Sequence, residues 1–205
     1  MKEGEILVHK FEPENKEKLD SKERREKLPP KTILKQLGLK KGDIVADIGC
    51  GSGFFTIPAG ELVGEQGKVF ALDISSEMLQ TVEDKIATQN LTNIETRLTE
   101  EDDLKLSRGS VNFALLSFVL HEAENLHKFI AEVKRILSSE GTLAIIEWRK
   151  EPTESGPPLE HRVSWQQTVD ILESQGFKAI KTWKPEEISQ AISPDYYGVT
   201  ARLRA

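Results

Sequence analysis

The sequence predicts an α/β fold: a doubly wound, mostly parallel seven-stranded sheet with an antiparallel closing strand. Short apolar runs alternate with helical patterns along residues 43–148. Runs such as "DIVADIG" and "KVFALD" lack a polar–apolar alternation, as expected when helices cover both faces of a parallel sheet. Residues 177–205 then hold two strand patterns with no strong helical pattern between them, which indicates a closing strand pair.

Each element has its own signal. The predicted strands are residues 43–49, 68–73, 93–98, a stretch within 110–120, 141–148, 177–183 and 197–205, and the predicted helices are residues 28–39, 54–63, 75–90, 125–137 and 165–175. Prolines suit the start of the first helix, and Gly38 suits its end. Serines precede the third helix as capping residues. Ser164 and Gln167 predict a capping box at the last one.

Composition narrows the function classes. A chain of 205 residues makes one domain, with room for a small appendage. The formal net charge of −6 argues against a general nucleic-acid binder, because neutralising phosphates needs a basic face. No apolar run approaches the ~20 residues of a membrane span, and charges interrupt the N-terminal segment. Cys50 is the single cysteine, so we expect no internal disulfide and a cytoplasmic location.

The N-terminal segment differs from the rest in charge. Residues 1–41 carry 12 basic and 8 acidic side chains, although the whole chain is acidic. Acids precede bases by four positions at Asp20 with Arg24 and at Glu23 with Lys27, which supports an exposed helix. A solvated helical face and a mobile basic flap over an anionic ligand both fit this pattern. We predict a charged helical lid over residues 1–30, followed by a ligand-binding domain over residues 31–205.

The stretch "VADIGCGSG" at residues 45–53 ends a strand with three glycines at alternate positions. Glycine lets the backbone approach a ligand closely, so this stretch predicts a turn under a bound molecule. The dinucleotide motif G-x-G-x-x-G fits at Gly49 and Gly51, but Phe54 stands at its last position. A P-loop is excluded because no G-K-[ST] follows.

The run from Asp47 to Gly53 instead resembles the first motif of the class I S-adenosylmethionine (SAM)-dependent methyltransferases, D-x-G-x-G-x-G. "ALDIS", followed by Glu77-Met78-Leu79, is similar to their second motif. "LLSFVLHE" is similar to their fourth-strand motif, and "EVKRILSSEGTLAIIEW" to the segment entering strand five. These segments span roughly residues 30–148 in the right order. They most resemble the small-molecule group that includes the ubiquinone and menaquinone methyltransferases, which have a Rossmann-like methyltransferase fold.

The resemblance implies SAM as cofactor and S-adenosylhomocysteine as its product. It places Asp73 on the ribose hydroxyls, Ile74 and Met78 around the adenine, and either Glu100 or Glu101 near the adenine amino group. Amide groups of the glycine turn suit the methionine end of the cofactor, with Ser117 near its ammonium. The predicted cofactor-binding residues are Asp47, Gly49, Cys50, Gly51, Gly53, Asp73, Ile74, Met78, Glu100, Glu101, Ser117 and Phe118.

Two residues after the fourth strand are the candidates for catalysis. His121 and Glu122 are expected to border the transferred methyl group, where a histidine can deprotonate or orient an acceptor. A hydrogen-bonded residue at the lip of the pocket is the alternative for His121. The other histidines, His9, His127 and His161, have no metal-ligand spacing, so no metal is predicted. Phe11, Phe118, Trp148, Tyr196 and Tyr197 are aromatic residues expected near the mouth of the pocket.

The acceptor is expected to be a small molecule methylated on oxygen, nitrogen or carbon by direct displacement. The single cysteine argues against a multi-cysteine arsenite methyltransferase, and no N/D-P-P-Y/F motif follows strand four. Two alternatives stay open: a regulatory protein that binds SAM without turnover, and an NAD(P)-dependent oxidoreductase. No nucleic-acid partner is predicted, and the sequence does not specify an oligomeric state.

Overall fold

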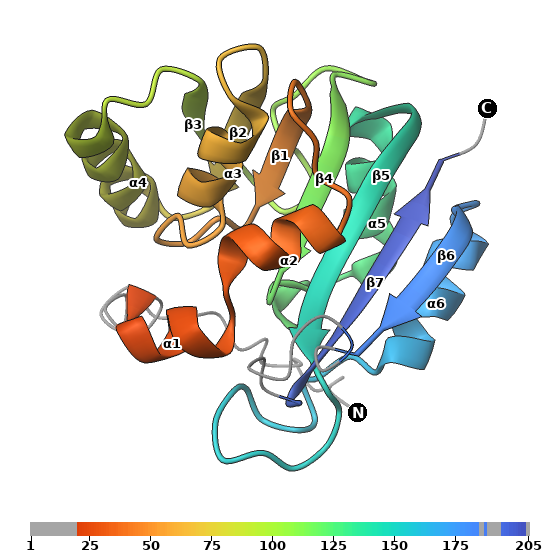
Figure 1. Cartoon of the computed structure of the whole chain (residues 1–205). Coiled ribbons are helices and arrows are strands. Elements are labelled where there is room, and N and C mark those ends of the chain that lie inside the picture. The colour runs from red at the N-terminus through yellow and green to blue at the C-terminus, as the bar shows by residue number, and fades with distance from the viewer. Residues whose placement is uncertain (1–19, 185–186, 188–193, 204–205) are drawn as a thin grey trace, which may run out of the picture.

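The computed structural model describes residues 20–184, 187 and 194–203. Its centre is one seven-stranded sheet with the strand order β3-β2-β1-β4-β5-β7-β6 (Figure 1). The strands are β1 (Ile44–Ile48), β2 (Lys68–Asp73), β3 (Ile94–Leu98), β4 (Val111–Ser117), β5 (Leu137–Trp148), β6 (Lys178–Trp183) and β7 (Tyr196–Arg202). The pairs from β3 to β5 are parallel, and β7 runs antiparallel to both β5 and β6. The predicted fold class is confirmed.

Helices cover both faces of this sheet. They are α1 (Lys22–Lys27), α2 (Pro30–Gln36), α3 (Thr56–Val63), α4 (Ser76–Gln89), α5 (Leu126–Ile136) and α6 (Trp165–Ser174), with a 3-10 turn η2 (Leu120–Glu122). In Figure 1, α2 and α3 lie in front of the sheet, and α5 and α6 lie behind it. The core accordingly has a large cluster on each face, one including Ile33 and Val63 and the other including Phe129 and Leu172. The capping box of Ser164 and Gln167 is confirmed at α6.

Among the boundaries that differ from the prediction, two have a clear local reason. The first helix after β1 begins at Thr56 rather than at residue 54, because residues 49–55 are used in a turn. Strand β5 begins at Leu137 rather than at residue 141. Leu137 already pairs with Val111 of β4, and an irregularity then shifts the register before Thr142 pairs with Phe113.

The topology places a crevice at the carboxyl ends of β1 and β4. The chain runs from β1 outward through β2 to β3, then returns so that β4 pairs with the other side of β1. Open α/β sheets bind ligands where the strand order reverses in this way. Of the predicted lid, residues 1–19 lie outside the described part. Leu28, which follows α1, is fully buried in the same cluster as α2 and α3.

In the part of the chain that the structure describes, no helix has the length and apolar character needed to cross a membrane.

Candidate active site

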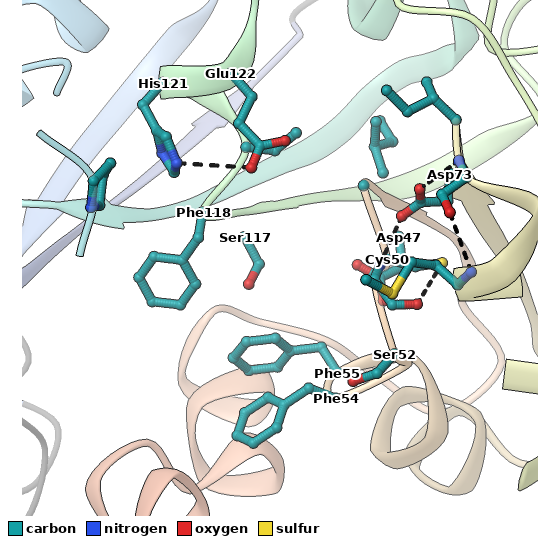
Figure 2. Close-up of a pocket in the computed structure, with 18 of the residues that line it drawn as sticks. Asp47, Cys50, Ser52, Phe54, Phe55, Asp73, Ser117, Phe118, His121 and Glu122 are labelled. Atoms are coloured by element: carbon teal, nitrogen blue, oxygen red, sulfur yellow. Dashed lines mark hydrogen bonds and ion pairs between the residues drawn. The ribbon is translucent and has the colours of Figure 1, made fainter. Parts of the chain in front are cut away.

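A cavity of about 940 Å³ opens at this crevice. Figure 2 shows two facing groups of side chains around it, with Asp73 and Cys50 on one side and Phe118 and His121 on the other. We call the first group the acidic wall; its residues are Asp47, Gly49–Ser52, Asp73–Ser75, Met78 and Thr99–Glu101. We call the second the aromatic wall; its residues are Arg24, Phe118, His121, Trp148, Ser155–Pro157 and Tyr196.

The glycine turn is held in shape by its own amide groups. The N–H groups of Gly49 and Cys50 both donate to the carbonyl of Leu72, at 2.8 and 2.9 Å. The N–H of Gly51 donates to Asp73 Oδ2 at 2.8 Å, and that of Gly53 to the carbonyl of Cys50 at 3.0 Å. The donors of these four residues are thus used within the chain. Whether amides of the turn hold the methionine end stays a prediction.

Gly49 explains why the turn needs glycine. Its φ is +67°, and a Cβ atom there would lie 2.8 Å from Cγ2 of Val119, just after β4. Gly53 has a different setting, since it lies outside the cavity lining. A Cβ atom at Gly53 would approach Val82 of α4 to 3.2 Å. Close packing against α4 is thus the role that the structure gives Gly53, in place of the predicted cofactor contact.

Asp73 joins the ends of two turns at the edge of the cavity. Its Oδ1 accepts the N–H of Ser75 at 2.9 Å, while Oδ2 accepts that of Gly51. Ser75, and not Asp73, caps α4, since its side chain accepts the N–H of Met78 at 3.3 Å. Burial raises the pKa of Asp73 against the opposing effect of these N–H donors. The N–H of Ile74 also acts on this carboxylate, so about one of its four acceptor sites is left for a ligand hydroxyl.

Asp47 is a second buried acid on this wall, with 2% of its surface exposed. Its Oδ2 accepts the hydroxyl of Thr56 at 2.6 Å. Burial raises its pKa to about 7, the Thr56 hydroxyl opposes this effect, and the charge of Asp73 adds to it. Two acids at one end of a cavity favour a cationic ligand group.

The remaining residues of the acidic wall form its outer part. Met78 is buried, whereas Ile74 is 51% exposed although it lines the cavity. Glu101 Oε1 accepts the N–H groups of Glu124 and Asn125 at 2.8 and 3.2 Å, just ahead of α5. Glu100 is exposed and lies 3.2 Å from Lys105 Nζ. Both acids line the cavity, and which of them meets an adenine stays a prediction.

The aromatic wall begins where β4 ends. Ser117 lines the cavity, and Phe118 follows it with a φ of +60°, a region that a bulky residue rarely adopts. Its ring lies 5.7 Å from that of Trp148 and 4.9 Å from that of Tyr196, between centroids. Tyr197 was also expected here, but the structure places it in the core of the opposite face. Successive residues of a strand point to opposite faces, so Tyr196 and Tyr197 cannot share the cavity.

His121 and Glu122, the predicted catalytic pair, both line the cavity. His121 Nδ1 lies 3.0 Å from Glu147 Oε1. Its Nε2 lies 3.8 Å from Glu122 Oε1, and Figure 2 marks this pair with a dashed line. Burial lowers the pKa of His121, but the hydrogen bond and charge of Glu147, together with the charge of Glu122, outweigh this effect and raise it overall. Glu147 was not among the site residues predicted from the sequence. The available signal was an acid inside the apolar strand "LAIIEW".

Helix α1 also contributes to the cavity, through Glu23, Arg24 and Lys27, together with its N-cap residue Ser21. The guanidinium carbon of Arg24 lies 4.4 Å from the ring centre of Phe54 and 5.5 Å from that of Phe118. Burial lowers the pKa of Arg24 to about 10, so it is charged at neutral pH. The charge pattern predicted the helix, but no spacing singled out Arg24 or Phe54 as site residues.

Arg162 shapes the loop that completes the aromatic wall. It is 4% exposed and donates five hydrogen bonds to residues 149–157. The acceptors are the carbonyls of Arg149, Glu151, Ser155 and Pro157 and the hydroxyl of Thr153. The fork of one arginine thus fixes a loop whose residues 155–157 line the cavity.

Among the described residues, no group of three or more His, Cys, Asp or Glu side chains is arranged to hold a metal ion.

Comparisons with known proteins agree with this geometry. The profile of a family described as a methyltransferase domain matches residues 39–188. A demethylmenaquinone methyltransferase of Lactobacillus johnsonii is 32% identical over 119 residues, which make up 57% of this chain and 48% of that protein. An arsenite methyltransferase of Halobacterium salinarum is 28% identical over 162 residues, 74% of this chain and 41% of that protein. The chain spans less than half the length of either relative.

The structural similarity extends further along the chain. A crystal structure of a SAM-dependent methyltransferase from Aquifex aeolicus superposes with a TM-score of 0.87 at 34% identity. The match covers 95% of this chain and 100% of that one. With the family match over residues 39–188, this shows that the chain belongs to the SAM-dependent methyltransferases.

Proposed function

We propose that this chain transfers the methyl group of SAM to a small-molecule acceptor inside the cavity, by direct displacement. The observation that supports this most is the two-walled cavity, acidic on one side and aromatic on the other. Its volume of about 940 Å³ lies at the upper end of the range usual for ligand pockets, which gives room for two molecules. The bound cofactor supplies an activated methyl group on a sulfonium sulfur.

The acidic wall fits the cofactor. Asp73 keeps acceptor capacity beyond its main-chain donors and can accept a ribose hydroxyl. Ile74 and Met78 present apolar surface for the adenine at the same edge. Asp47 and Asp73 favour the positive charge of the cofactor's ammonium and sulfonium groups. The contacts predicted for Cys50, Ser117, Phe118 and the two acids Glu100 and Glu101 are proposals of the same kind.

The aromatic wall fits a flat acceptor. Phe118, Trp148 and Tyr196 form a cluster of rings with centroids 4.8–5.7 Å apart, and such faces stack on planar molecules. One relative is named for demethylmenaquinone and another for arsenite. Cys50 is the only cysteine in the sequence, and burial raises the pKa of its thiol well above the ordinary value. A thiolate for arsenic is therefore not provided, and we favour a planar organic acceptor.

We further propose that residues 1–30 act as a lid, as the sequence analysis predicted. In support, α1 and its N-cap residue together supply four residues of the cavity lining. Asp20 pairs with Lys85 of α4, and Lys85 Nζ donates to the carbonyl of Ser52 in the glycine turn at 2.7 Å. This link holds the start of α1 over the acidic wall. We also propose a cytoplasmic location, as expected from the single cysteine and the charges that interrupt the N-terminal segment.

Calorimetric titration with SAM, S-adenosylhomocysteine and NADH tests the cofactor. We expect micromolar binding of the first two and none of NADH. Binding of NADH alone would indicate that the glycine turn is a dinucleotide-binding site. Turnover is then measured by mass spectrometry on reduced demethylmenaquinone, simple phenols and arsenite. Binding of SAM without methylation of any of them would favour the regulatory alternative over the enzyme.

A further inference from the structure

Glu147 is a carboxylate in the interior of the sheet. It lies one residue before the end of β5 and has no exposed surface, with β4 and β7 on either side of its strand. An acid in such a place is costly to bury unless it is fully hydrogen-bonded. Its strand is otherwise apolar at this end, since Leu143 to Ile146 are all buried. The position therefore needs an explanation beyond packing.

The hydrogen bonds of Glu147 all lead to the turn after β4 or to its own neighbour. Oε2 accepts the N–H of Leu120 at 3.0 Å. Oε1 accepts the N–H of Trp148 at 2.7 Å and lies 3.0 Å from His121 Nδ1. Because both oxygens already accept main-chain protons, His121 Nδ1 faces an acceptor and carries a proton itself. The other ring nitrogen, Nε2, then has the free lone pair, and His121 lines the cavity.

Building on the methyl transfer proposed above, we propose that Glu147 is a positioning residue that fixes His121 as the Nδ1–H tautomer, so that Nε2 receives a proton from a protic acceptor. The acceptor atom, an oxygen or an acidic carbon, forms its bond to the methyl carbon as the carbon–sulfur bond breaks. The bonding pair of that carbon–sulfur bond stays on the sulfur. The acceptor's proton passes to His121 Nε2, and Glu147 stabilises the resulting imidazolium.

The charges around His121 suit this role. Glu147 of β5 and Glu122 of η2 favour the protonated ring, while Arg162, ahead of α6, opposes it. The structure therefore assigns a substrate class: an acceptor with a hydroxyl or an acidic C–H that must lose a proton, rather than a thioether or a tertiary amine. Glu122 lies farther away, with Oε1 at 3.8 Å from Nε2, and it does not touch Nδ1.

The tautomer is measured directly by two-bond ¹H–¹⁵N NMR on histidine-labelled protein with S-adenosylhomocysteine added. His121→Asn identifies the signal among the four histidines. We expect the Nδ1–H form above the pKa of His121, with that pKa above 6.5. Finding the Nε2–H form in the unmodified protein overturns the proposal, and this arm needs no variant of Glu147 to fold.

Glu147→Gln tests the coupling between the two residues. Without the negative charge, burial governs His121, so its pKa is expected to fall below 6.5 and its tautomer to change. Asn93→Ala is the matched control, because it removes two hydrogen bonds, to the carbonyls of Gly60 and Gly64 at 2.8 and 2.9 Å, next to β3 at the far side of the sheet. That control is expected to lower thermal stability without moving the His121 signal. A Glu147→Gln variant that loses stability but keeps the His121 pKa overturns the proposal.

Turnover separates this inference from the function on which it rests. Methylation of 1,4-naphthoquinol is expected to fall about 10–100-fold in kcat in both Glu147→Gln and His121→Asn, with SAM affinity unchanged within about threefold. The pH profile of kcat/KM is expected to lose its limb near the His121 pKa in His121→Asn. Failure to bind SAM would defeat the methyltransferase proposal itself. SAM binding with methylation of dimethyl sulfide alone, unchanged by Glu147→Gln, would defeat only the positioning role.

Discussion

The acidic wall and the aromatic wall are built in different ways. Every residue of the acidic wall lies between Asp47 and Glu101. The ends of three adjacent strands and the turns after them supply all of these residues except Met78, which lies in the first turn of α4. The aromatic wall takes residues from α1, from the ends of β4 and β5, from the following loop and from β7, a range from Arg24 to Tyr196. Main-chain hydrogen bonds fix the first wall, whereas side chains such as Phe118, Glu147 and Arg162 fix the second.

This difference suggests that the acidic wall is suited to one constant cofactor, whereas the aromatic wall is suited to acceptors that can vary. A wall built from neighbouring segments can keep binding the same cofactor when distant parts of the sequence change. A wall assembled from distant segments can change its acceptor when any one segment changes. If that division is correct, a substitution in one wall alters the ligand of that wall and leaves the other ligand's affinity unchanged.

Asp47→Asn is expected to give the largest effect, on stability. The pKa of Asp47 is raised from 3.8 to about 7, so the folded chain holds its proton more tightly than the unfolded chain. The free energy of unfolding therefore falls as the pH rises from about 4 to about 7, and it stays low above that range. The variant lacks this fall and should be about 2–4 kcal/mol more stable at pH 8. Urea unfolding at several pH values measures it.

The control for this measurement is Asp170→Asn, an exposed acid on α6. Its unfolding curve should follow that of the unmodified protein at every pH. If the free energy of unfolding of Asp47→Asn has the same pH dependence as that of the unmodified protein, the pKa of Asp47 is not raised by burial. The acidic wall would then lack its main electrostatic feature.

Asp73→Asn is expected to weaken SAM binding by about 1–3 kcal/mol, the usual loss for a hydrogen bond to a charged group. In the unmodified protein Asp73 Oδ2 accepts the N–H of Gly51. The side-chain amide of the asparagine can place its NH2 group at this position, where two donors would face each other. Calorimetry measures the change, with S-adenosylhomocysteine expected to show the same loss. An unchanged affinity would show that another acid binds the ribose, and an equal loss for the acceptor would contradict the independence of the two walls.

Arg162→Lys probes the aromatic wall. Lysine keeps the charge but cannot supply the five hydrogen bonds that fix residues 149–157. We expect the KM for a planar acceptor to rise about 3–10-fold, or about 0.7–1.4 kcal/mol, at constant SAM affinity. Arg108→Lys, on an exposed loop, is the control. A change in SAM affinity without a change in KM would reverse the assignment of the walls.

Lys85→Met is expected to have the smallest effect. It removes the link between Asp20 and the carbonyl of Ser52, and partly exposed ion pairs contribute about 0–1 kcal/mol. Stopped-flow displacement of S-adenosylhomocysteine should show a dissociation rate about two- to fivefold faster. Lys22→Met, whose side chain is 92% exposed, should leave the rate unchanged. A faster rate in both variants would assign the effect to general charge rather than to the link.

The sequence could predict the sheet and the acidic wall because both depend on local patterns. The alternation of strands and helices fixes the fold class, and Asp47, Gly49 and Asp73 stand at fixed distances from strand ends. Gly53 fitted the same spacing, yet the hydrogen bonds of the turn direct it toward α4. Motif spacing identifies which residues form a turn but not which of them face the cavity.

The aromatic wall could be predicted only in part, because its residues meet through the strand order. Trp148 and Tyr196 were expected near the mouth of the pocket and line the cavity, but nothing within a few positions of Arg24 indicates that it joins them. Tyr196 and Tyr197 were equivalent in the sequence, and the antiparallel pairing of β7 with β5 decides which one faces the site. Glu147 carried a usable signal, an acid among buried apolar residues, but its partner His121 lies 26 positions away.

The left-handed backbone at Phe118 has a consequence for protein engineering. A bulky residue at a φ of +60° costs on the order of 1–3 kcal/mol, and asparagine would tolerate the same backbone at lower cost. Asparagine would also remove the ring that contacts Trp148 and Tyr196. A library selected for heat resistance alone would be free to replace this residue, whereas one selected for methyl transfer would keep it. Comparing the residues recovered at position 118 from the two selections would show whether this position favours activity at the expense of thermal stability.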